Sequence, residues 1–310
     1  FNSIRRKKHV VTANKSLISK YGDQLALLAE KNKVNIEFEA AVAGGIPIIR
    51  TLKEGLVANK TKKIYGILNG TSNFILSNMD KMNISFNKVL NKAKKLGYAE
   101  NNPKSDLNGD DVRSKIQILS SLAFNCFINK NNINQEGINF IDEIDIKNAN
   151  ILGYKIKHIG LSEISEGKLI QRVNPCLIKK DSRLSNVNGV LNAVIIEGEP
   201  LGKSVLQGEG AGAGPTTSAL VSDICSILRG NLKYPFSVSY KKRKKINSTD
   251  ISNQLFSNYI RLDVVDKKGV LSSITKIMSK NKISVKRLIQ DSFKGKRYAS
   301  LIIISHKTQN

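Results

Sequence analysis

The first fifty residues alternate between strand-like and helix-like segments, and this alternation constrains the fold more than any other feature. Residues 8–11 form a short strand candidate that ends in Thr12-Ala-Asn-Lys15. Apolar residues at helical spacing follow, and Val34–Glu39 then alternates with the period of a strand before a second helix starts near Pro47. This order is typical of a parallel α/β sheet, in which ligands bind beyond the carboxyl ends of the strands. Lys15 and Glu39 occupy those positions.

The rest of the chain passes from helices to strands. Two helical segments follow Asn69-Gly-Thr-Ser-Asn73, and a third starts near Asp111. Between Lys155 and about Val205, short alternating strands separated by turns predict a second, antiparallel sheet that carries the middle helices on one face. Residues 259–265, 283–289 and 298–304 then alternate as strands around one helix, a βαββ series. The residues expected on the inward face of that helix are Val270, Leu271, Ile274, Ile277 and Met278.

Composition and charge exclude several classes of protein. The 310 residues carry a formal net charge of +25, but the basic residues are mostly scattered lysines without interleaved aromatic residues, so we expect no nucleic-acid partner. The basic cluster Lys241–Lys245 is expected to be a solvated linker. No apolar run approaches the length of a membrane span, so no membrane partner is expected. Cys126, Cys176 and Cys225 are widely spaced in apolar surroundings, which predicts buried, reduced thiols in a cytoplasmic protein.

One helical face combines charged with apolar side chains. Asp111 and Lys115 are four residues apart, and the same face continues through Ile118 and Leu122. An ordinary surface ion pair is one interpretation of this spacing. The apolar continuation favours the other, a half-buried acid and base in a cleft, where proton-transfer groups are found.

The loop before this helix adds two more acidic residues, Glu100 and Asp106, among Asn, Gly and Pro residues. Such a composition by itself predicts only turns. Together with the pair on the helix, however, the loop offers three carboxylates and one ammonium, which suits a zwitterionic, amino-acid-like substrate. The three histidines of the chain are not near these motifs in the sequence. Lysine is therefore the leading candidate for proton transfer.

A glycine-rich segment at residues 208–213 matches the pattern G-x-G-x-x-A, but no βα unit with an acidic residue about 20 positions later follows it. A hinge is one interpretation. Because Pro215 and Thr216 open a helix, backbone contact with an anionic ligand is the other. The main phosphate loop of a dinucleotide-binding protein would then lie outside this chain.

Several motifs together resemble the homoserine dehydrogenase family, in the order in which that family has them. They are Thr12-Ala-Asn-Lys15, Glu39-Ala-Ala-Val-Ala-Gly-Gly-Ile-Pro47, Asn69-Gly-Thr-Ser-Asn73, the run from Gly97 through Asp111 to Lys115, and Gly210 to Thr216. The closing βαββ series resembles an ACT regulatory module. The resemblance covers essentially the whole chain, and the spacing of Glu100, Asp111 and Lys115 is its most specific part.

The resemblance implies an α/β protein of three parts. These are a partial Rossmann-type nucleotide-binding domain, an α+β substrate and dimerisation domain with a mixed or antiparallel sheet, and a partial, ferredoxin-like ACT module. The chain would divide into residues 1–45 (nucleotide-binding domain), 46–207 (substrate and catalysis), 208–232 (return to the nucleotide-binding domain), 233–255 (linker) and 256–310 (ACT). It would be truncated at both ends and inactive by itself.

The resemblance also implies an activity and its residues. The reaction would be reversible hydride transfer between L-homoserine and L-aspartate 4-semialdehyde with NAD or NADP, in threonine and methionine biosynthesis. Lys115 would be the general acid and base, and Asp111 would orient Lys115 and the substrate. The other substrate-binding residues would be Glu100, Asp106 and Thr71. The cofactor would contact Lys15, Gly97 and Gly212.

Further partners follow from the same resemblance. A sodium ion would bind the side chain of Glu39 and the backbone carbonyls of Val42, Gly44 and Ile46, oxygen ligands of the kind that hard cations prefer. The chain would form a homodimer or a larger homo-oligomer, and an amino acid, in this family usually threonine, would act as effector at the ACT module. The competing hypothesis is an amino-acid-sensing, ACT-type binding protein with a non-catalytic front half.

Overall fold

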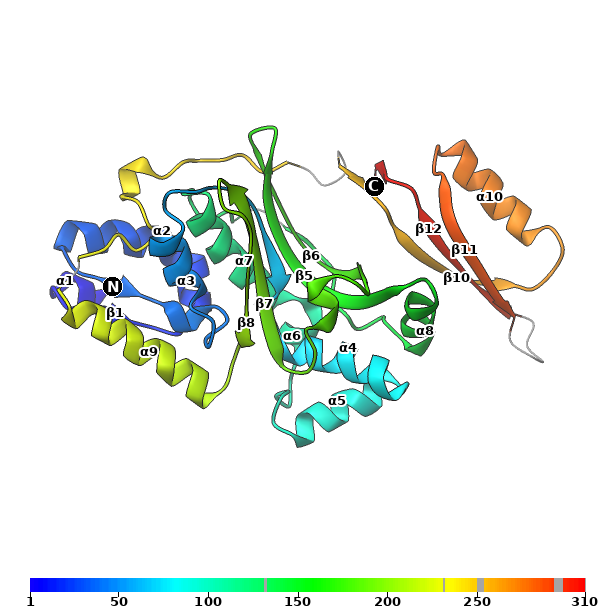
Figure 1. Ribbon diagram of the computed structural model, residues 1–310, viewed down its shortest axis with the longest axis horizontal. Coiled ribbons are helices and arrows are strands. Elements are labelled where there is room, and N and C mark those ends of the chain that lie inside the picture. Colours follow the sequence, from blue (N-terminus) through cyan, green and yellow to red (C-terminus); the bar gives the residue numbers. More distant parts are fainter. Residues whose placement is uncertain (131–132, 231, 250–253, 293–297, 310) are drawn as a thin grey trace.

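The N-terminal part of the chain is an α/β unit around two parallel strands (Figure 1). The computed structural model describes residues 1–130, 133–230, 232–249, 254–292 and 298–309. α1 (Asn2–Arg5) and β1 (Val10–Val11) precede α2 (Lys15–Asn32), and β2 (Ile36–Glu37) pairs with β1 in parallel. The predicted order of strand, helix and strand is confirmed, with strands shorter than expected. Lys15 begins the helix that follows β1.

The segment after β2 turns inward and stays buried. A 3₁₀ turn at Glu39–Ala41 leads to α3 (Ile48–Arg50), which continues as a π-helical turn at Thr51–Gly55. The alternating glutamates of this segment are both buried, because each has a polar partner: Lys53 Nζ lies 2.8 Å from Glu37 Oε2, and backbone N–H groups of the following helix bind Glu39.

The central sheet has six strands in the order β4–β6–β5–β3–β7–β8, and all its neighbours are antiparallel except β4 and β6. The strands are β3 (Lys60–Ile67), β4 (Asn134–Gln135), β5 (Tyr154–Ser165), β6 (Lys168–Lys179), β7 (Leu191–Glu199) and β8 (Gly202–Glu209). The predicted second sheet is therefore confirmed, but its strands are longer than expected. β3 was missed because its first half, Lys-Thr-Lys-Lys, lacks apolar residues.

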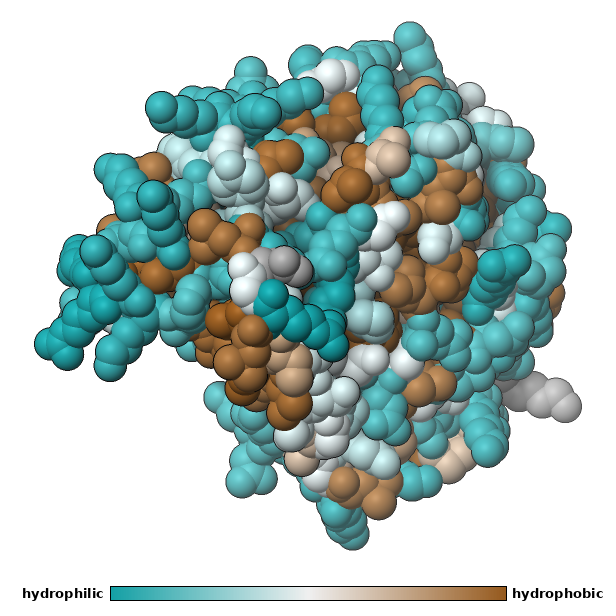
Figure 2. All heavy atoms as spheres, turned by 60° about the vertical axis from the view of Figure 1, so that its left-hand side comes forward, coloured by the Kyte–Doolittle hydropathy of each residue, from teal (hydrophilic) through white to brown (hydrophobic). Residues whose placement is uncertain are grey.

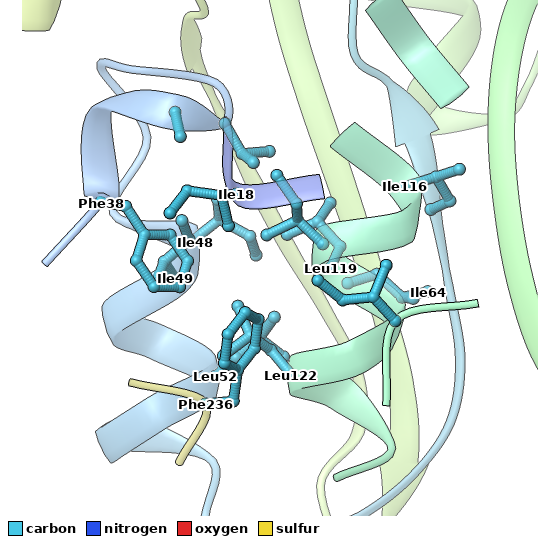
Figure 3. Close-up of a cluster of buried hydrophobic side chains, with 14 of the residues drawn as sticks. Ile18, Phe38, Ile48, Ile49, Leu52, Ile64, Ile116, Leu119, Leu122 and Phe236 are labelled. Atoms are coloured by element: carbon cyan, nitrogen blue, oxygen red, sulfur yellow. The ribbon is translucent and has the colours of Figure 1, made fainter. Parts of the chain in front are cut away.

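Five helices accompany this sheet within the described ranges: α4 (Gly70–Met82), α5 (Phe86–Lys95), α6 (Lys104–Asn108), α7 (Asp110–Ala123) and α8 (Glu143–Ile151). α7 packs against β3, β5 and β6 on one side and against α2 on the other. Figure 3 shows its Leu119 and Leu122 facing Ile48, Ile49 and Leu52 of the α3 region. One apolar core thus joins the N-terminal unit to the sheet, with α7 at its centre.

The chain then returns to the N-terminal unit through α9 (Ala213–Leu228), which packs against β1 and the 39–41 turn. Gly44 N–H donates to the carbonyl of Gly210 at 3.0 Å just before this helix. Exposed apolar side chains of α9 include Val221 and Ile224, and hydrophobic groups also gather on this side of the molecule in Figure 2. Cys225 on the same helix is exposed, so the expectation of a buried thiol is wrong there; Cys126 is buried.

The basic segment after α9 is not solvated throughout, and the expectation of a solvated linker is wrong at Arg243. A 3₁₀ turn at Tyr240–Lys242 precedes this residue. Its guanidinium group is buried, 2.6 Å from Asp23 of α2, and it also donates to Ser121 at the end of α7. The basic segment Lys241–Lys245 is therefore attached to the core through the buried side chain of Arg243.

The C-terminal module has three antiparallel strands in the order β10–β12–β11 with one helix. The elements are β10 (Tyr259–Val265), α10 (Val270–Lys280), β11 (Val285–Ser292) and β12 (Tyr298–Ser305); β9 (Leu255–Phe256) pairs with β13 (Thr308–Gln309). The βαββ order is as predicted. The prediction of the inward face of α10 is partly wrong, because Leu271 and Ile277 are 38% and 62% exposed. Across the described ranges, no helix is both long and apolar enough to cross a membrane.

Candidate active site

α7 places an acid and a base inside the molecule. It begins at Asp110 after Gly109, whose φ of +90° is left-handed, and a side chain at this glycine would come within about 3 Å of Val173 and His158. A residue without Cβ is thus required to start the helix at this point. Asp111 and Lys115 are only 4% and 7% exposed. The interpretation of this face as a surface ion pair is therefore wrong, and the expected burial is confirmed.

Asp111 lies between two ammonium groups. Its Oδ2 is 2.8 Å from Lys115 Nζ, and its Oδ1 is 2.8 Å from Lys15 Nζ. Burial favours the neutral form, but the charges of Lys115 and Lys15 outweigh it and hold the pKa of Asp111 well below its usual range. Asp111 is thus a permanent anion that joins the helix after β1 to the start of α7.

Lys115 has a second fixed partner, the backbone carbonyl of Leu68, to which its Nζ donates at 2.7 Å. This carbonyl belongs to the turn between β3 and α4. An ammonium has three hydrogens to donate, and Asp111 and Leu68 take two of them. The third remains for a ligand, since no other partner of Lys115 Nζ occurs among the described residues.

Asn69 organises the acidic side of the cluster and was not predicted as a site residue. Its amide donates to Asp106 at 2.8 Å and to Asp111 at 2.9 Å. Its Oδ1 accepts the Ser72 N–H at 2.7 Å and so caps α4. An Asn immediately before a predicted helix signals the cap, but the contacts with two acids from a later loop leave no signal in the sequence.

The remaining predicted substrate residues lie around this cluster at different depths. Burial and the charge of Asp111 raise the pKa of Asp106, against a hydrogen bond from Asn69. The Thr71 hydroxyl donates to the Tyr98 carbonyl at 2.6 Å, which ties the first turn of α4 to the acidic loop. Glu100 is exposed. It acts on the cluster through its charge, as one of the groups that act on Lys15.

Of the three predicted cofactor residues, Lys15 is part of the cluster. Burial lowers its pKa, but Asp111 outweighs this effect and raises it, with smaller contributions from Asp106 and Glu100. Its side chain is 40% exposed, so it also borders solvent. Gly97 and Gly212 are exposed and have left-handed φ values of +75° and +114°. Within the described part of the chain, neither glycine takes part in the hydrogen bonds of the cluster.

The four predicted sodium ligands form a separate group. Both oxygens of Glu39 accept backbone N–H groups, from Ile49 and Arg50 at 2.8 Å each. Burial nevertheless raises the pKa of Glu39 to about 7. The Ile46 carbonyl accepts the Ile48 N–H at 2.7 Å, whereas the carbonyls of Val42 and Gly44 accept no hydrogen bond from the described residues. In the same ranges no cluster of three or more His, Cys, Asp or Glu side chains could hold a metal ion.

One histidine lies closer to the site than its sequence position indicates. His158 of β5 contacts the Gly109 turn at the start of α7, and its Nε2 is 3.0 Å from the Glu136 carbonyl. The assumption that all histidines are remote from the motif is therefore wrong for His158. Burial lowers the pKa of its imidazole to about 4, so the ring is neutral at pH 7. It is 1% exposed and cannot exchange protons with a bound ligand directly.

This arrangement can transfer a proton to or from an oxygen atom. Lys115 is aimed by Asp111 and the Leu68 carbonyl, and its remaining hydrogen can meet a hydroxyl or carbonyl oxygen. The surrounding carboxylates favour a cationic group elsewhere on the same ligand. Such a site suits an amino acid whose side chain carries an alcohol or an aldehyde.

Comparison with known proteins gives a consistent result. The family model for homoserine dehydrogenase matches residues 47–225. The chain is 41% identical over 312 residues to a homoserine dehydrogenase from Neisseria gonorrhoeae, covering 99% of this chain and 72% of that protein. It is 38% identical to the homoserine dehydrogenase of Bacillus subtilis, covering 99% of this chain and 71% of that protein.

Solved structures agree with these relatives. A homoserine dehydrogenase from Thiobacillus denitrificans superposes with a TM-score of 0.90 at 37% identity, covering 99% of this chain and 71% of that chain. A hyperthermophilic archaeal homoserine dehydrogenase in complex with NADPH has a TM-score of 0.63 at 30% identity, covering 74% of this chain and 67% of that chain.

Proposed function

The chain belongs to the homoserine dehydrogenase family, and from this premise we propose that Lys115 transfers the proton of its reaction while Asp111 aims it. The enzyme is an NAD(P)-dependent oxidoreductase of amino-acid biosynthesis that interconverts L-homoserine and L-aspartate 4-semialdehyde. The competing hypothesis of a non-catalytic, amino-acid-sensing protein is not favoured. The observation that carries the proposal is the buried ammonium of Lys115, held at 2.8 Å by Asp111 and at 2.7 Å by the Leu68 carbonyl.

In the direction of alcohol oxidation, Lys115 starts as the neutral amine and accepts the hydroxyl proton, becoming an ammonium, while the carbon that bears the hydroxyl loses a hydride. In the reverse direction, the Lys115 ammonium donates a proton to the aldehyde oxygen. The bound cofactor supplies the hydride acceptor or donor. The burial of Lys115 keeps bulk water away from the proton in transit. Asp111 stays charged throughout, because two ammonium groups lower its pKa.

The other members of the cluster would bind the substrate. Asp106 and Glu100 offer carboxylates to its amino group, and the Thr71 hydroxyl lies on the first turn of α4, where helix N–H groups favour a carboxylate. Thr71 also donates to the Tyr98 carbonyl. Movement of the acidic loop would therefore shift Thr71 and change its contact with the substrate. These three residues are therefore assigned to binding and not to proton transfer.

The residues present suit the nicotinamide end of a cofactor. Gly97 and Gly212 offer exposed backbone without a side chain, and Lys15 is partly exposed beside the acidic cluster. We assign all three to cofactor contact.

A sodium ion fits the group around Glu39. The raised pKa of this carboxyl reflects a buried negative charge that a cation would stabilise, and the carbonyls of Val42 and Gly44 point to no partner in the described chain. With Ile46 they complete an oxygen set suited to a hard cation. The ion would then fix the turn that joins β2 to α3.

The C-terminal module is proposed to bind an amino-acid effector, with residues 256–310 as a partial ACT domain after the linker at 233–255. A hollow of about 280 Å³ lies at the β10–α10 turn, lined by residues that include Asp266, Lys267 and Gln290. Division of the preceding chain at residues 45, 207 and 232 and assembly into a homodimer or larger homo-oligomer belong to the same proposal. Calorimetric titration with threonine tests the binding of the effector, and sedimentation velocity tests the assembly.

The function itself is tested by following the absorbance of the reduced nicotinamide cofactor during turnover. The intact protein should reduce NAD or NADP with L-homoserine and not with L-serine, whose hydroxyl is one carbon closer to the charged end. Absence of turnover with homoserine, in the presence of threonine binding by calorimetry, would favour the sensing hypothesis instead.

A further inference from the structure

A buried lysine outside the cluster has no carboxylate within hydrogen-bond distance among the described residues. Lys157 of β5 is 1% exposed. Its Nζ lies 2.6 Å from the Val187 carbonyl, 3.1 Å from Asn188 Oδ1, 3.2 Å from Asn73 Oδ1 and 3.3 Å from Ser77 Oγ. All four are neutral oxygens. Burial lowers the pKa of this amine to about 8, the charge of Lys155 lowers it further, and the charge of Asp80 opposes both effects without outweighing them.

The same four contacts join two separate parts of the fold. Asn73 and Ser77 belong to α4, whereas Val187 and Asn188 belong to the connection that leads into β7. The Asn73 amide strengthens this junction, because it donates to the carbonyls of Val187 at 3.1 Å and Leu191 at 3.0 Å. Lys157 thus fastens the 187–191 connection to the first turns of α4.

This connection touches the site on two sides. A side chain at Gly70 would come within 2.9 Å of the Val190 carbonyl, so the connection packs directly on the first residue of α4. Directly after the connection, Asn192 of β7 lies so close to Gly210 that a side chain at that glycine would come within 2.0 Å of Asn192 Nδ2. The connection therefore lies between the start of α4 and the glycine-rich segment before α9.

We propose that Lys157 is a positioning residue for the substrate: through the 187–191 connection it fixes the first turn of α4, on which Thr71 and the capping residue Asn69 lie. This inference rests on the proposed function, because it concerns the substrate end of that site. Lys157 itself touches neither the substrate nor the reacting atoms.

A positioning role and a merely structural role predict different kinetics. The first turn of α4 contacts the end of the substrate that does not react, so its misplacement weakens substrate and transition state alike and raises KM more than it lowers kcat. Loss of overall structure would instead reduce the amount of active enzyme, which lowers kcat and leaves KM unchanged. The ratio of the two effects distinguishes the roles.

The test compares Lys157→Met with Lys155→Met in the intact protein. Lys155 lies two positions away on the same strand and pairs with Asp80 at 3.6 Å near the surface. Steady-state kinetics with homoserine should give at least about a tenfold rise in KM for Lys157→Met, a kcat within about threefold of wild type and an unchanged dissociation constant for the cofactor. Lys155→Met should match wild type. A folded Lys157→Met protein with the wild-type KM, or one that loses kcat alone, overturns the inference.

A milder variant keeps the test decisive where Lys157→Met does not fold. Asn188 is exposed and contributes one of the four contacts, so Asn188→Ala should fold and raise KM by about threefold, which corresponds to the lower end of the net value of a single hydrogen bond. In the double variant the two changes should be less than additive, because they break the same junction. An unchanged KM in Asn188→Ala overturns the inference. A wild-type protein without homoserine turnover overturns the proposed function, and this inference with it.

Discussion

Lys15 and Asp111 form an ion pair of 2.8 Å that joins the start of α2, after the first parallel strand, to the start of α7. The other oxygen of the same carboxylate holds Lys115. The part of the molecule assigned to the cofactor and the part assigned to proton transfer therefore share one anion. A cofactor that shifts Lys15 would act on the base through Asp111 without touching it.

Replacement of Lys115 by alanine should abolish turnover. General acid–base catalysis typically contributes a factor of about 10² to 10⁴, so kcat for homoserine oxidation should fall by at least about that range. Cofactor affinity, measured by fluorescence titration, should stay within about twofold because Lys15 keeps its carboxylate. Arg113→Ala serves as the control, since this residue lies on the same helix in a half-exposed pair with Asp110. Wild-type kcat in Lys115→Ala would remove this residue from its role.

Two substitutions of Asn69 should separate its role as the cap of α4 from its role as the donor to Asp106 and Asp111. Asn69→Ala removes both the cap of α4 and the donor to Asp106 and Asp111, whereas Asn69→Ser keeps a capping oxygen. In urea unfolding, the alanine variant should be less stable than the serine variant by about 1 kcal/mol, the usual value of a cap. Both should lose about tenfold or more in kcat/KM, because neither holds the two acids. A serine variant with wild-type kcat/KM would show that the amide donor does not matter.

The sequence predicted the elements whose signal is local. The face of α7 with Asp111, Lys115, Ile118 and Leu122 is buried as its spacing indicated, and the closing βαββ order was also right. β3 was not predicted because its first half consists of polar residues and shows no apolar alternation. Its position depends on pairing with β5 and β7, and the residues of the strand alone do not specify this pairing.

Contacts between segments that are distant in the sequence could not be predicted, for a related reason. The position of Asn69 between two acids and of His158 beside Gly109 depends on how the loop, the helix and the sheet pack together. Arg243 lies in a polar, basic run, and its burial follows from Asp23 and two aromatic rings supplied by other segments. Residue type and period say nothing about such partners. The assigned site roles remain predictions that the variants described here test.

Arg243 should be a large contributor to stability despite its place in a basic segment. It binds Asp23 at 2.6 Å and lies between the rings of Phe127 and Phe236 at 4.9 and 4.2 Å. Arg243→Met leaves the partly buried Asp23 carboxylate without its cation, which typically costs about 3 to 5 kcal/mol. Urea unfolding should show this loss, and addition of Asp23→Asn should recover part of it. Lys242→Met, an exposed neighbour, should stay within about 0.5 kcal/mol of wild type.

His158 should make stability depend on pH in the acid range. Its folded pKa of about 4 is below the value of about 6.5 for an unfolded histidine, so unfolding takes up a proton between these two values. The free energy of unfolding therefore falls as the pH is lowered through this window, by up to about 3 kcal/mol for a shift of this size. At pH 7 and above, this contribution does not change with pH.

The measurement must separate His158 from Glu39, which titrates in the same window with the opposite sign. Burial raises the folded pKa of Glu39 to about 7, so the folded state holds its proton longer than the unfolded state and stability falls as the pH rises. The quantity to compare is therefore the difference in unfolding free energy between wild type and His158→Gln at each pH. This difference should move in favour of the variant as the pH falls from about 6.5 to about 4.5. A difference that is flat with pH for His158→Gln would mean that this imidazole takes up its proton over the same pH range in the folded and unfolded protein, which contradicts the prediction.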